Sequence, residues 1–459
     1  MNLGTVCAVL ALATVLVLSP AGGESFAREL NIDEAVELAL ERNLSLDAAR
    51  LDYESANWGL RSARASLLPS VGLSSTARRV DQDTYTRANA SLGFAEQMGI
   101  DVEPFLYETT YETGFRVSAP IWNGQLWGAV GVAGGARDAA GHAYEARRRA
   151  VVAEAKAAYF GVLRAEALLS VSLDAVDAAW ENAEAARRRH EVGLVPLSEV
   201  LRWQVLAAEY EKALADAETA VTMARTQLVN VLGLPLDLTF EFPAVDPAAL
   251  DARYTEFAWL TAPGYLTESR ARELLAGNPD YEGLADVTRM SGAGVSVARG
   301  AFMPSLNASG SYGWKADSDI KPDDETAWSV TLALDLPIFT SFKNVSDYQQ
   351  SKRSYLAARR RQEDLERVMI ASLRGAVSIL VSSSKALVAA DKLIEQSADH
   401  LKSVTNRHNE GMAPYTEFTD ARVLFDRSRV GYVNAIYDGL MAVAEIERLL
   451  GDAPDGDAA

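Results

Sequence analysis

The sequence predicts a mainly α-helical fold of two similar halves, each of which contributes two strands to a membrane β-barrel. Three observations support this fold class. Long helical patterns alternate with short strand patterns, the same order of elements occurs twice, and one turn sequence recurs 218 residues later. The first copy, 189–204, reads RHEVGLVPLSEVLRWQ, and the second, 407–422, reads RHNEGMAPYTEFTDAR. Duplication in register indicates one repeated architecture rather than unrelated domains.

The N-terminus and the composition predict an exported protein. An apolar run, Val6–Leu18, is too short for a comfortable membrane span, and Ser-Phe-Ala at 25–27 is a small-x-small cleavage site. Residues 1–27 are therefore interpreted as a signal peptide. The only cysteine, Cys7, lies in this run, so we expect the mature chain to have no disulfide, thiolate metal site or cysteine-linked lipid. A net charge of −19 argues against a nucleic-acid partner.

The first half, 28–232, begins with a helical pattern over 31–66. Apolar and polar residues then alternate over 67–79 and again over 110–121, which predicts two strands with one apolar and one polar face. The segment 88–94 between them also alternates and could extend a strand.

A second helical pattern, 123–190, covers 68 residues, which is roughly 100 Å of helix at 1.5 Å per residue. It leads into a predicted hairpin tip over 190–196 and a return helix over 196–231. The tip has a glycine where the long helix can end and a proline three residues later, where the next helix can begin. Apolar residues in the return helix repeat every seven positions, which indicates lengthwise packing against another helix.

The second half, 265–450, repeats this order after a proline-rich linker over 233–264. Its predicted elements are a leading helix, strands over 303–315 and 327–338, a long helix, a tip over 408–414 and a return helix. The acidic tail, 451–459, is expected to lie outside the fold.

The four predicted strands indicate a membrane partner. Each has an apolar face and a length of about ten residues, which suits a bilayer, and we interpret Tyr312, Trp314 and Trp328 as aromatic anchors at the membrane interface. Four strands cannot close into a barrel, and an open edge in lipid leaves backbone groups unpaired. The chain must therefore share a barrel with copies of itself. Eight strands from a dimer would pack shut, whereas twelve from a trimer could leave a pore.

The repeated plan, together with Ser-Leu-Leu-Pro-Ser at 66–70, Ala-Pro-Ile-Trp-Asn-Gly at 119–124 and the two glycine-containing tips, resembles the TolC-like outer-membrane efflux factor family. The resemblance implies a homotrimer in the outer membrane of a Gram-negative bacterium. Its 12-stranded barrel would continue into a long periplasmic α-helical barrel. The resemblance also implies an exit duct for substrates delivered by an inner-membrane pump and a periplasmic adaptor protein.

The family closes its periplasmic end with acidic residues six and nine positions after the second tip glycine. In this sequence those residues are Glu417 and Asp420. Glu199 stands six positions after the first tip glycine, but Arg202 stands at nine, so the acidic pair is not duplicated. The resemblance therefore assigns the periplasmic aperture to Glu417, Asp420 and Glu199. Glu199 and Glu417 also lie in the first turn of a helix, where a carboxylate complements the helix dipole, so both roles stay open.

The resemblance places the adaptor-docking surface at the two tips. The residues assigned to it are Arg189, His190, Gly193, Pro196, Arg407, His408, Gly411 and Pro414. The glycines and prolines first serve the turns themselves. The two histidines stand where the family commonly has an aromatic residue. They can simply close the ends of their helices, or in a trimer form a ring of six that responds to pH or metal.

Three alternatives to an efflux channel share parts of this pattern to different degrees. The same architecture could serve as the outer-membrane component of type I protein secretion, and a periplasmic coiled-coil adaptor would share the hairpins but should lack four amphipathic strands. An enzyme is disfavoured because the four histidines are scattered and form no catalytic constellation. We expect no cofactor and no metal site. The transported substrate is not indicated.

Overall fold

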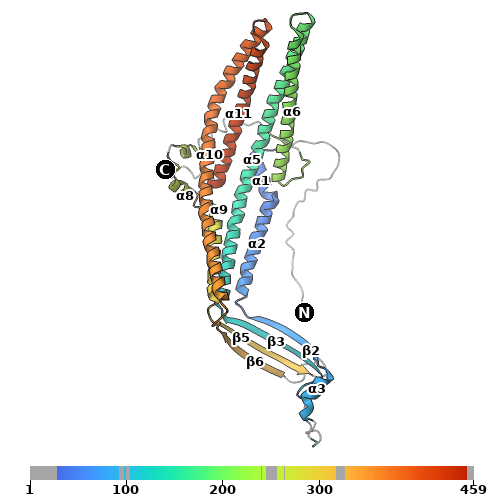
Figure 1. The fold of residues 1–459 in the computed structure, drawn as a ribbon, viewed down its shortest axis with the longest axis vertical. Helices are drawn as coiled ribbons and strands as arrows, with labels where there is room; N and C mark the ends of the chain where they lie inside the picture. The colour runs from blue at the N-terminus through green and yellow to red at the C-terminus, as the bar shows by residue number, and fades with distance from the viewer. Residues whose placement is uncertain are drawn as a thin grey trace, which may run out of the picture.

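The computed structural model describes residues 28–92, 98–99, 104–238, 240–243, 256–262, 264–316 and 326–451. The predicted leader, 1–27, and the tail beyond Gly451 lie outside these ranges. The described residues form a tall helical part with a four-stranded sheet at one end (Figure 1).

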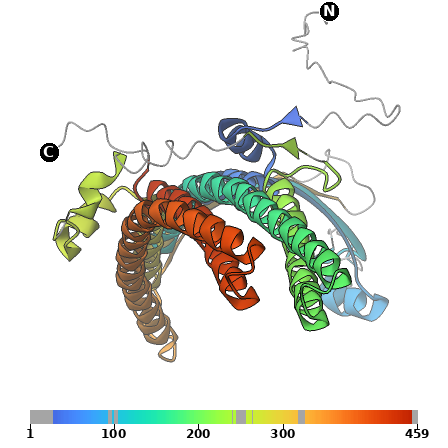
Figure 2. The same cartoon turned by 90° about the horizontal axis from the view of Figure 1, so that it is seen from above.

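Two long helices, α5 (Gly124–Glu191) and α10 (Lys343–Asn409), run through the whole helical part. Each turns back at a tip into a shorter helix, α6 (Leu197–Val231) or α11 (Tyr415–Leu450). The leading helices α2 (Leu44–Ala65) and α9 (Pro279–Gly300) occupy the half nearer the sheet. Helix α5 packs against α2, α6 and α9, and α10 packs against α9 and α11. Seen from above, the helices form a curved wall (Figure 2).

Smaller elements surround the middle of the wall. Helix α1 (Ile32–Arg42) packs on α5, and α8 (Glu268–Leu274) and the short helix η2 (Ala258–Thr261) contact α10. Strand β1 (Arg28–Glu29) pairs in parallel with β4 (Phe240–Glu241). No helix in the described ranges combines the length and the apolar character that crossing a bilayer would require.

The sheet contains β2 (Ser70–Arg79), β3 (Thr109–Trp122), β5 (Ser305–Ala316) and β6 (Thr326–Asp335) in that order, and all neighbours are antiparallel. Strands β3 and β5 join the two halves. Between β2 and β3, helix α3 (Gln82–Asn89) and η1 (Ala90–Leu92) replace the strand that alternation over 88–94 suggested, so that suggestion is wrong up to Leu92. The Asp81 carboxylate accepts the Thr84 N–H at 2.9 Å and starts this helix instead.

Prolines set the limits of the strands. Pro69 and Pro304 precede β2 and β5, and Pro337 follows β6, because proline has no N–H to donate to a strand ladder. Pro120 lies within β3, where the pairing with β5 shifts register between Pro120 and Trp122. The predicted strands 67–79, 303–315 and 327–338 are consequently shorter at their proline ends.

The strand register separates the two faces of the sheet. One transverse row consists of Leu73, Phe115, Tyr312 and Trp328, which pair in succession across the sheet. The adjacent row consists of Gly72, Arg116, Ser311 and Ser329. Paired residues of antiparallel strands point to the same side, and successive residues alternate sides. One face is therefore apolar and the other polar, and the apolar face is exposed along β2 and β6.

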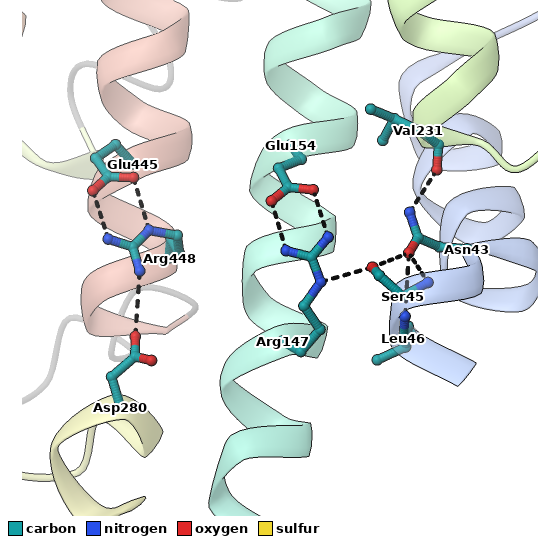
Figure 3. Close-up of polar contacts among 9 residues, drawn as sticks. All are labelled: Asn43, Ser45, Leu46, Arg147, Glu154, Val231, Asp280, Glu445 and Arg448. Carbon is teal, nitrogen blue, oxygen red and sulfur yellow. Dashed lines mark hydrogen bonds and ion pairs between the residues drawn. The ribbon is translucent and has the colours of Figure 1, made fainter. Parts of the chain in front are cut away.

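Two asparagines join the short helices end to end. The helical pattern over 31–66 is interrupted at Asn43, whose side-chain oxygen accepts the N–H groups of Ser45 at 3.0 Å and Leu46 at 3.2 Å. Its amide nitrogen donates to the Val231 carbonyl in the last turn of α6, at 2.9 Å (Figure 3). Asn43 thus caps the start of α2 and, at the same time, provides a hydrogen-bond donor for a carbonyl at the end of α6.

The same joint occurs in the second half. Asn278 accepts the Asp280 N–H at 2.8 Å and donates to the Leu449 carbonyl of α11 at 2.8 Å. Both asparagines are buried. The Asn43 joint borders an apolar core centred on α5, and the Asn278 joint borders one centred on α10.

Replacing Asn278 by alanine is expected to lower the free energy of unfolding by about 2–4 kcal/mol. The substitution removes a helix cap worth about 1 kcal/mol and leaves the buried Leu449 carbonyl unpaired, which costs about 1–3 kcal/mol. Chemical denaturation in detergent measures the loss. Asn31→Ala, which removes only the exposed cap of α1, should cost about 1 kcal/mol. Equal losses in the two variants would contradict the double role of Asn278.

Candidate functional site: the paired helical tips

The two hairpin tips have the same backbone geometry. The Gly193 N–H donates to the His190 carbonyl and the Leu194 N–H to the Arg189 carbonyl, both at 2.9 Å. At the second tip Gly411 donates to His408 at 3.0 Å, and Met412 donates to Arg407. This pair of bonds is the Schellman motif, which requires a left-handed residue after the helix. The glycine φ angles of +76° and +74° meet that requirement.

Each proline follows three residues after its glycine and begins the return helix. Pro196 and Pro414 are the N-caps of α6 and α11, one position before the first helical residue, and neither has a side-chain cap. The tips are therefore tight, and apolar side chains at their ends are left exposed. Val192, Leu194 and Met412 are 70%, 75% and 61% exposed.

The tip histidines complete the turns. Nδ1 of His190 donates to the Val195 carbonyl at 2.9 Å, and Nδ1 of His408 donates to the Ala413 carbonyl at 3.0 Å. Both bonds reach a carbonyl five residues later, so the two histidines have the same structural role in their turns. His408 is also buried and packs against the Phe418 ring at 5.6 Å between centroids.

The two hairpins pack against each other below the tips. A buried apolar cluster contains side chains from all four hairpin helices: Ala183, Ala186, Val200, Trp203, Val404, Ala413, Phe418 and Ala421. Trp203 of α6 makes edge-to-face contacts with Tyr415 and Phe418 of α11, at centroid distances of 4.8 and 5.1 Å. The Tyr415 hydroxyl donates to the Arg202 carbonyl at 3.1 Å. Burial raises the pKa of Tyr415, so its phenol remains a donor at neutral pH.

The three carboxylates that the sequence predicts at the aperture have different surroundings. Glu417 is paired with Arg407 of its own hairpin, with Nη1 and Oε1 2.5 Å apart. Asp420 is exposed and makes no ion pair within the described part of the chain. Glu199 is largely buried and lies 3.8 Å from Nε2 of His408, across the boundary between the hairpins. The structure therefore places Glu417 and Asp420 on one face of α11, while Glu199 faces the second hairpin.

The duplicated arginines have different partners. Arg407 reaches Glu417, whereas Arg189, its counterpart, donates to the Asn409 side chain of the other tip at 3.0 Å. The repeat in sequence is therefore not a repeat in side-chain contacts.

A further polar network, here called the hairpin clasp, lies farther from the tips and consists of Asp174, Tyr210, Arg422, Asp426 and Arg429. Tyr210 of α6 donates to Asp426 of α11 at 3.1 Å, and Asp426 also pairs with Arg422 at 3.0 Å. Arg429 of α11 pairs with Asp174 of α5 at 2.7 Å. Burial, followed by the Asp426 charge, raises the pKa of Tyr210 to about 12, so the phenol stays neutral and donates its proton at physiological pH.

Sequence reasoning missed the hairpin clasp. Tyr210 is one of the residues that repeat every seven positions in the first return helix. That pattern predicts packing of its ring and does not indicate a hydrogen bond from its hydroxyl. The available signal was the charged group Arg422, Asp426 and Arg429 at four- and three-residue spacing on α11. These residues lie beside the seven-residue repeat of that helix, Phe418, Phe425 and Tyr432.

At the opposite end, the three predicted aromatic anchors share the apolar face of the sheet. Tyr312 and Trp328 are direct cross-strand partners and are 53% and 75% exposed. Trp314 is half-buried, and its indole Nε1 is buried without a hydrogen-bond partner among the described residues. Within the described ranges no group of three or more histidine, cysteine or acidic side chains is arranged to hold a metal ion.

Comparisons with known proteins agree with this fold. The chain is 26% identical over 447 residues to outer membrane protein OprJ of Pseudomonas aeruginosa, covering 94% of this chain and 86% of OprJ. It is 22% identical over 440 residues to outer membrane protein TolC of Vibrio cholerae, covering 93% and 92%. Among solved structures, the Campylobacter jejuni CmeC outer membrane channel superposes with a TM-score of 0.79 at 18% identity, covering 100% of this chain and 96% of CmeC.

The fold and the paired tips thus define an outer-membrane channel protein with a β domain and a periplasmic helical extension. A sequence model of outer membrane efflux proteins matches residues 35–234 and 271–452. The chain belongs to the outer membrane efflux protein family, and it is a transport protein rather than an enzyme.

Proposed function

We propose that three copies of this chain form one channel, whose tips dock a periplasmic adaptor that links it to an inner-membrane pump. The sheet carries the proposal. Within the described residues its outer strands, β2 and β6, each pair with one neighbour only, and an unpaired strand edge is unfavourable in lipid. Pairing β6 of one copy with β2 of the next removes every such edge, and three copies give a twelve-stranded barrel wide enough for a pore.

The tips support the docking part of the proposal. They lie at the end of the molecule farthest from the sheet (Figure 1), and their exposed apolar residues Val192, Leu194 and Met412 have no partner surface within the described chain. Exposed apolar side chains on a rigid turn are suited to a protein partner. Adjacent Glu417 and Asp420 would then surround the periplasmic entrance.

An arginine on the apolar face of the sheet should prevent insertion. Val330 and Thr331 are neighbours on β6 and point to opposite faces, apolar and polar respectively. Val330→Arg places a charge in lipid at a cost of about 2–4 kcal/mol per copy, whereas Thr331→Arg leaves it on the polar face. We expect Thr331→Arg and wild type to be recovered from outer membranes as detergent-bound trimers by native mass spectrometry, and Val330→Arg to be lost from that fraction.

Two results would contradict the proposal. A stable monomer or dimer in mild detergent would exclude the twelve-stranded assembly. Equal membrane recovery of the two arginine variants would show that the apolar face does not contact lipid.

A further inference from the structure

One arginine stands alone in the middle of the polar face of the sheet. Arg116 lies near the centre of β3 and is exposed. Eight positions of that face surround it, and every one is glycine or serine: Ser70, Gly72, Ser74, Gly114, Ser118, Ser309, Ser311 and Gly313. These side chains are too short to cover a guanidinium group and carry no charge. Within the described part of the chain, Arg116 makes no ion pair.

The other charges of the polar face do not neutralise Arg116. Glu112 and Lys315 are direct cross-strand partners of opposite sign, so they offset each other. Both lie four positions farther along the strands, which is about 14 Å at 3.4 Å per residue. Exposed charges more than about 10 Å apart are largely screened at 0.1 M salt. Arg78 and Asp335 lie at opposite ends of the face.

The glycine beside Arg116 on β2 is not required by packing. A Cβ added at Gly72 would meet nothing within 4 Å, and the φ angle of Gly72 is not positive. The pair Gly114 and Gly313 differs, because a Cβ at Gly114 would come within 2.8 Å of the Gly313 Cα. Glycine weakens a strand, and in a strand it often marks a place where another molecule approaches closely. Gly72 therefore leaves open space beside Arg116.

The opposite side of Arg116 provides further hydrogen-bond donors. Ser311, its cross-strand partner on β5, shares one hydrogen bond with Ser329 on β6, with the two hydroxyl oxygens 2.9 Å apart. Two hydroxyls carry two O–H groups, and this bond uses one of them. The second O–H remains available to an acceptor, next to a guanidinium with five donors of its own. An excess of donors beside an arginine suits a carboxylate or a phosphate.

We propose that Arg116 of three copies forms a ring in the barrel lumen that attracts solutes bearing carboxylate or phosphate groups on their way out. This arginine ring rests on the proposed trimeric barrel. Twelve strands about 4.8 Å apart and tilted by about 40° enclose roughly 24 Å between backbones. Side chains do not fill that width, so the polar face lines water, and threefold symmetry places the three guanidinium groups at one height. The channel then has two charge filters in series, acidic near the tips and basic in the barrel.

Planar-bilayer recordings with a tetravalent anion, hexacyanoferrate(II), test the arginine ring. The charged helical part cannot cross the bilayer, so the sheet opens toward the compartment opposite the one that receives the protein. The anion, added to that compartment in 0.1 M salt, should block wild-type trimers. Arg116→Gln should raise the half-blocking concentration by about tenfold, because the charges that hold the anion are removed. Arg116→Lys should retain most of the block, since it keeps the charge.

Lys315→Gln is the matched control. It also removes one positive charge per chain from the polar face, but one that lies about 14 Å along the strands from Arg116. The expected shift in half-blocking concentration is much smaller than for Arg116→Gln, because that distance exceeds the screening length of about 10 Å at 0.1 M salt. Equal shifts in the two variants would mean that diffuse positive charge, and not a ring at 116, attracts the anion. Absence of block in wild type would also overturn the proposal.

A thiol at the same position separates this inference from the proposed function. In a Cys7→Ser background, Arg116→Cys provides the only thiol. A methanethiosulfonate bearing trimethylammonium restores the positive charge and should restore the block, whereas one bearing sulfonate should not. If the thiol reacts from the sheet side and neither charge alters the block, only the arginine ring is wrong. If the thiol does not react, the polar face does not line a water-filled lumen, and the proposed barrel itself is wrong.

Discussion

Replacing Gly411 by proline is expected to abolish efflux while leaving trimers in the outer membrane, and Gly193→Pro should do the same. Proline fixes φ near −65°, whereas these glycines have φ of +74° and +76°. Proline also removes the N–H that donates to the carbonyl of the tip histidine, at 3.0 Å from Gly411 and 2.9 Å from Gly193. The turn must therefore change shape, and with it the surface proposed for the adaptor. The sheet, at the opposite end of the molecule, is untouched.

Growth of a strain lacking the chromosomal copy measures the effect. Loss of the protein first identifies a compound to which the cells become sensitive, and each variant is then tested for restored growth. Gly99→Pro is the matched control, because Gly99 also has φ of +76° but lies between β2 and β3. Gly411→Asn should retain most activity, since asparagine tolerates the left-handed conformation. Full growth with both tip prolines, at normal levels in outer-membrane fractions, would mean that the tips do not dock the adaptor.

Asp420→Asn is expected to weaken block of the channel by a multivalent cation, and Arg407→Ala is expected to strengthen it. A trimer carries three copies of the unpaired Asp420 carboxylate beside the proposed entrance. Crowded like charges attract cations, most strongly at low salt. Removing all three should weaken block by a multivalent cation from the periplasmic side by about tenfold or more, since each contributes on the order of 1 kcal/mol at contact in water. Arg407→Ala frees Glu417 from its ion pair and should strengthen the block.

Planar-bilayer recordings at low and high salt provide the measurement. Replacing both Glu417 and Asp420 by alanine should reduce block and cation preference further. Trimers should stay intact, because Phe418 and Ala421 of the buried apolar cluster below the tips are unchanged. Asp216→Asn also removes one negative charge per chain, but from the exposed face of α6, away from the tips. It should leave block unchanged. If Asp420→Asn and Asp216→Asn behave alike, the carboxylates near the tip do not form the entrance.

Local chemistry explains how much of the fold could be predicted. The four strands follow from strict alternation. Their predicted ranges ran past Pro69, Pro304 and Pro337, where the observed strands stop because proline cannot donate to a ladder. The positions of the two tips are indicated by a glycine with a proline three residues later, which occurs in both halves. These features depend on residues close in sequence, so one sequence is sufficient to indicate them. The exception is α3, where Asp81 provides a cap that outweighs a weak alternating pattern.

Contacts between distant residues could not be predicted in the same way. Asn43 and Asn278 stand 235 residues apart at equivalent positions of the two halves, but their bonds to Val231 and Leu449 span 188 and 171 residues. The ion pair between Arg407 and Glu417 forms only because the tip brings two helices together. Identical arginines in the two repeats have different partners, so even the duplication did not determine the side-chain network of the site.

The asparagine joints give the helical wall an uneven mechanical response. Helices α5 and α10 are continuous from sheet to tip. By contrast, α6 meets α2 through the Asn43 bond, and α11 meets α9 through the Asn278 bond and the ion pair of Arg448 with Asp280 at 3.4 Å (Figure 3). Each such bond contributes about 1 kcal/mol net. The helices can therefore slide at these joints much more easily than the continuous helices can stretch. We expect a load applied at the tips to displace the return helices first and to reach the strands only through α5 and α10. The periplasmic end can then change its width while the part in the membrane keeps its shape.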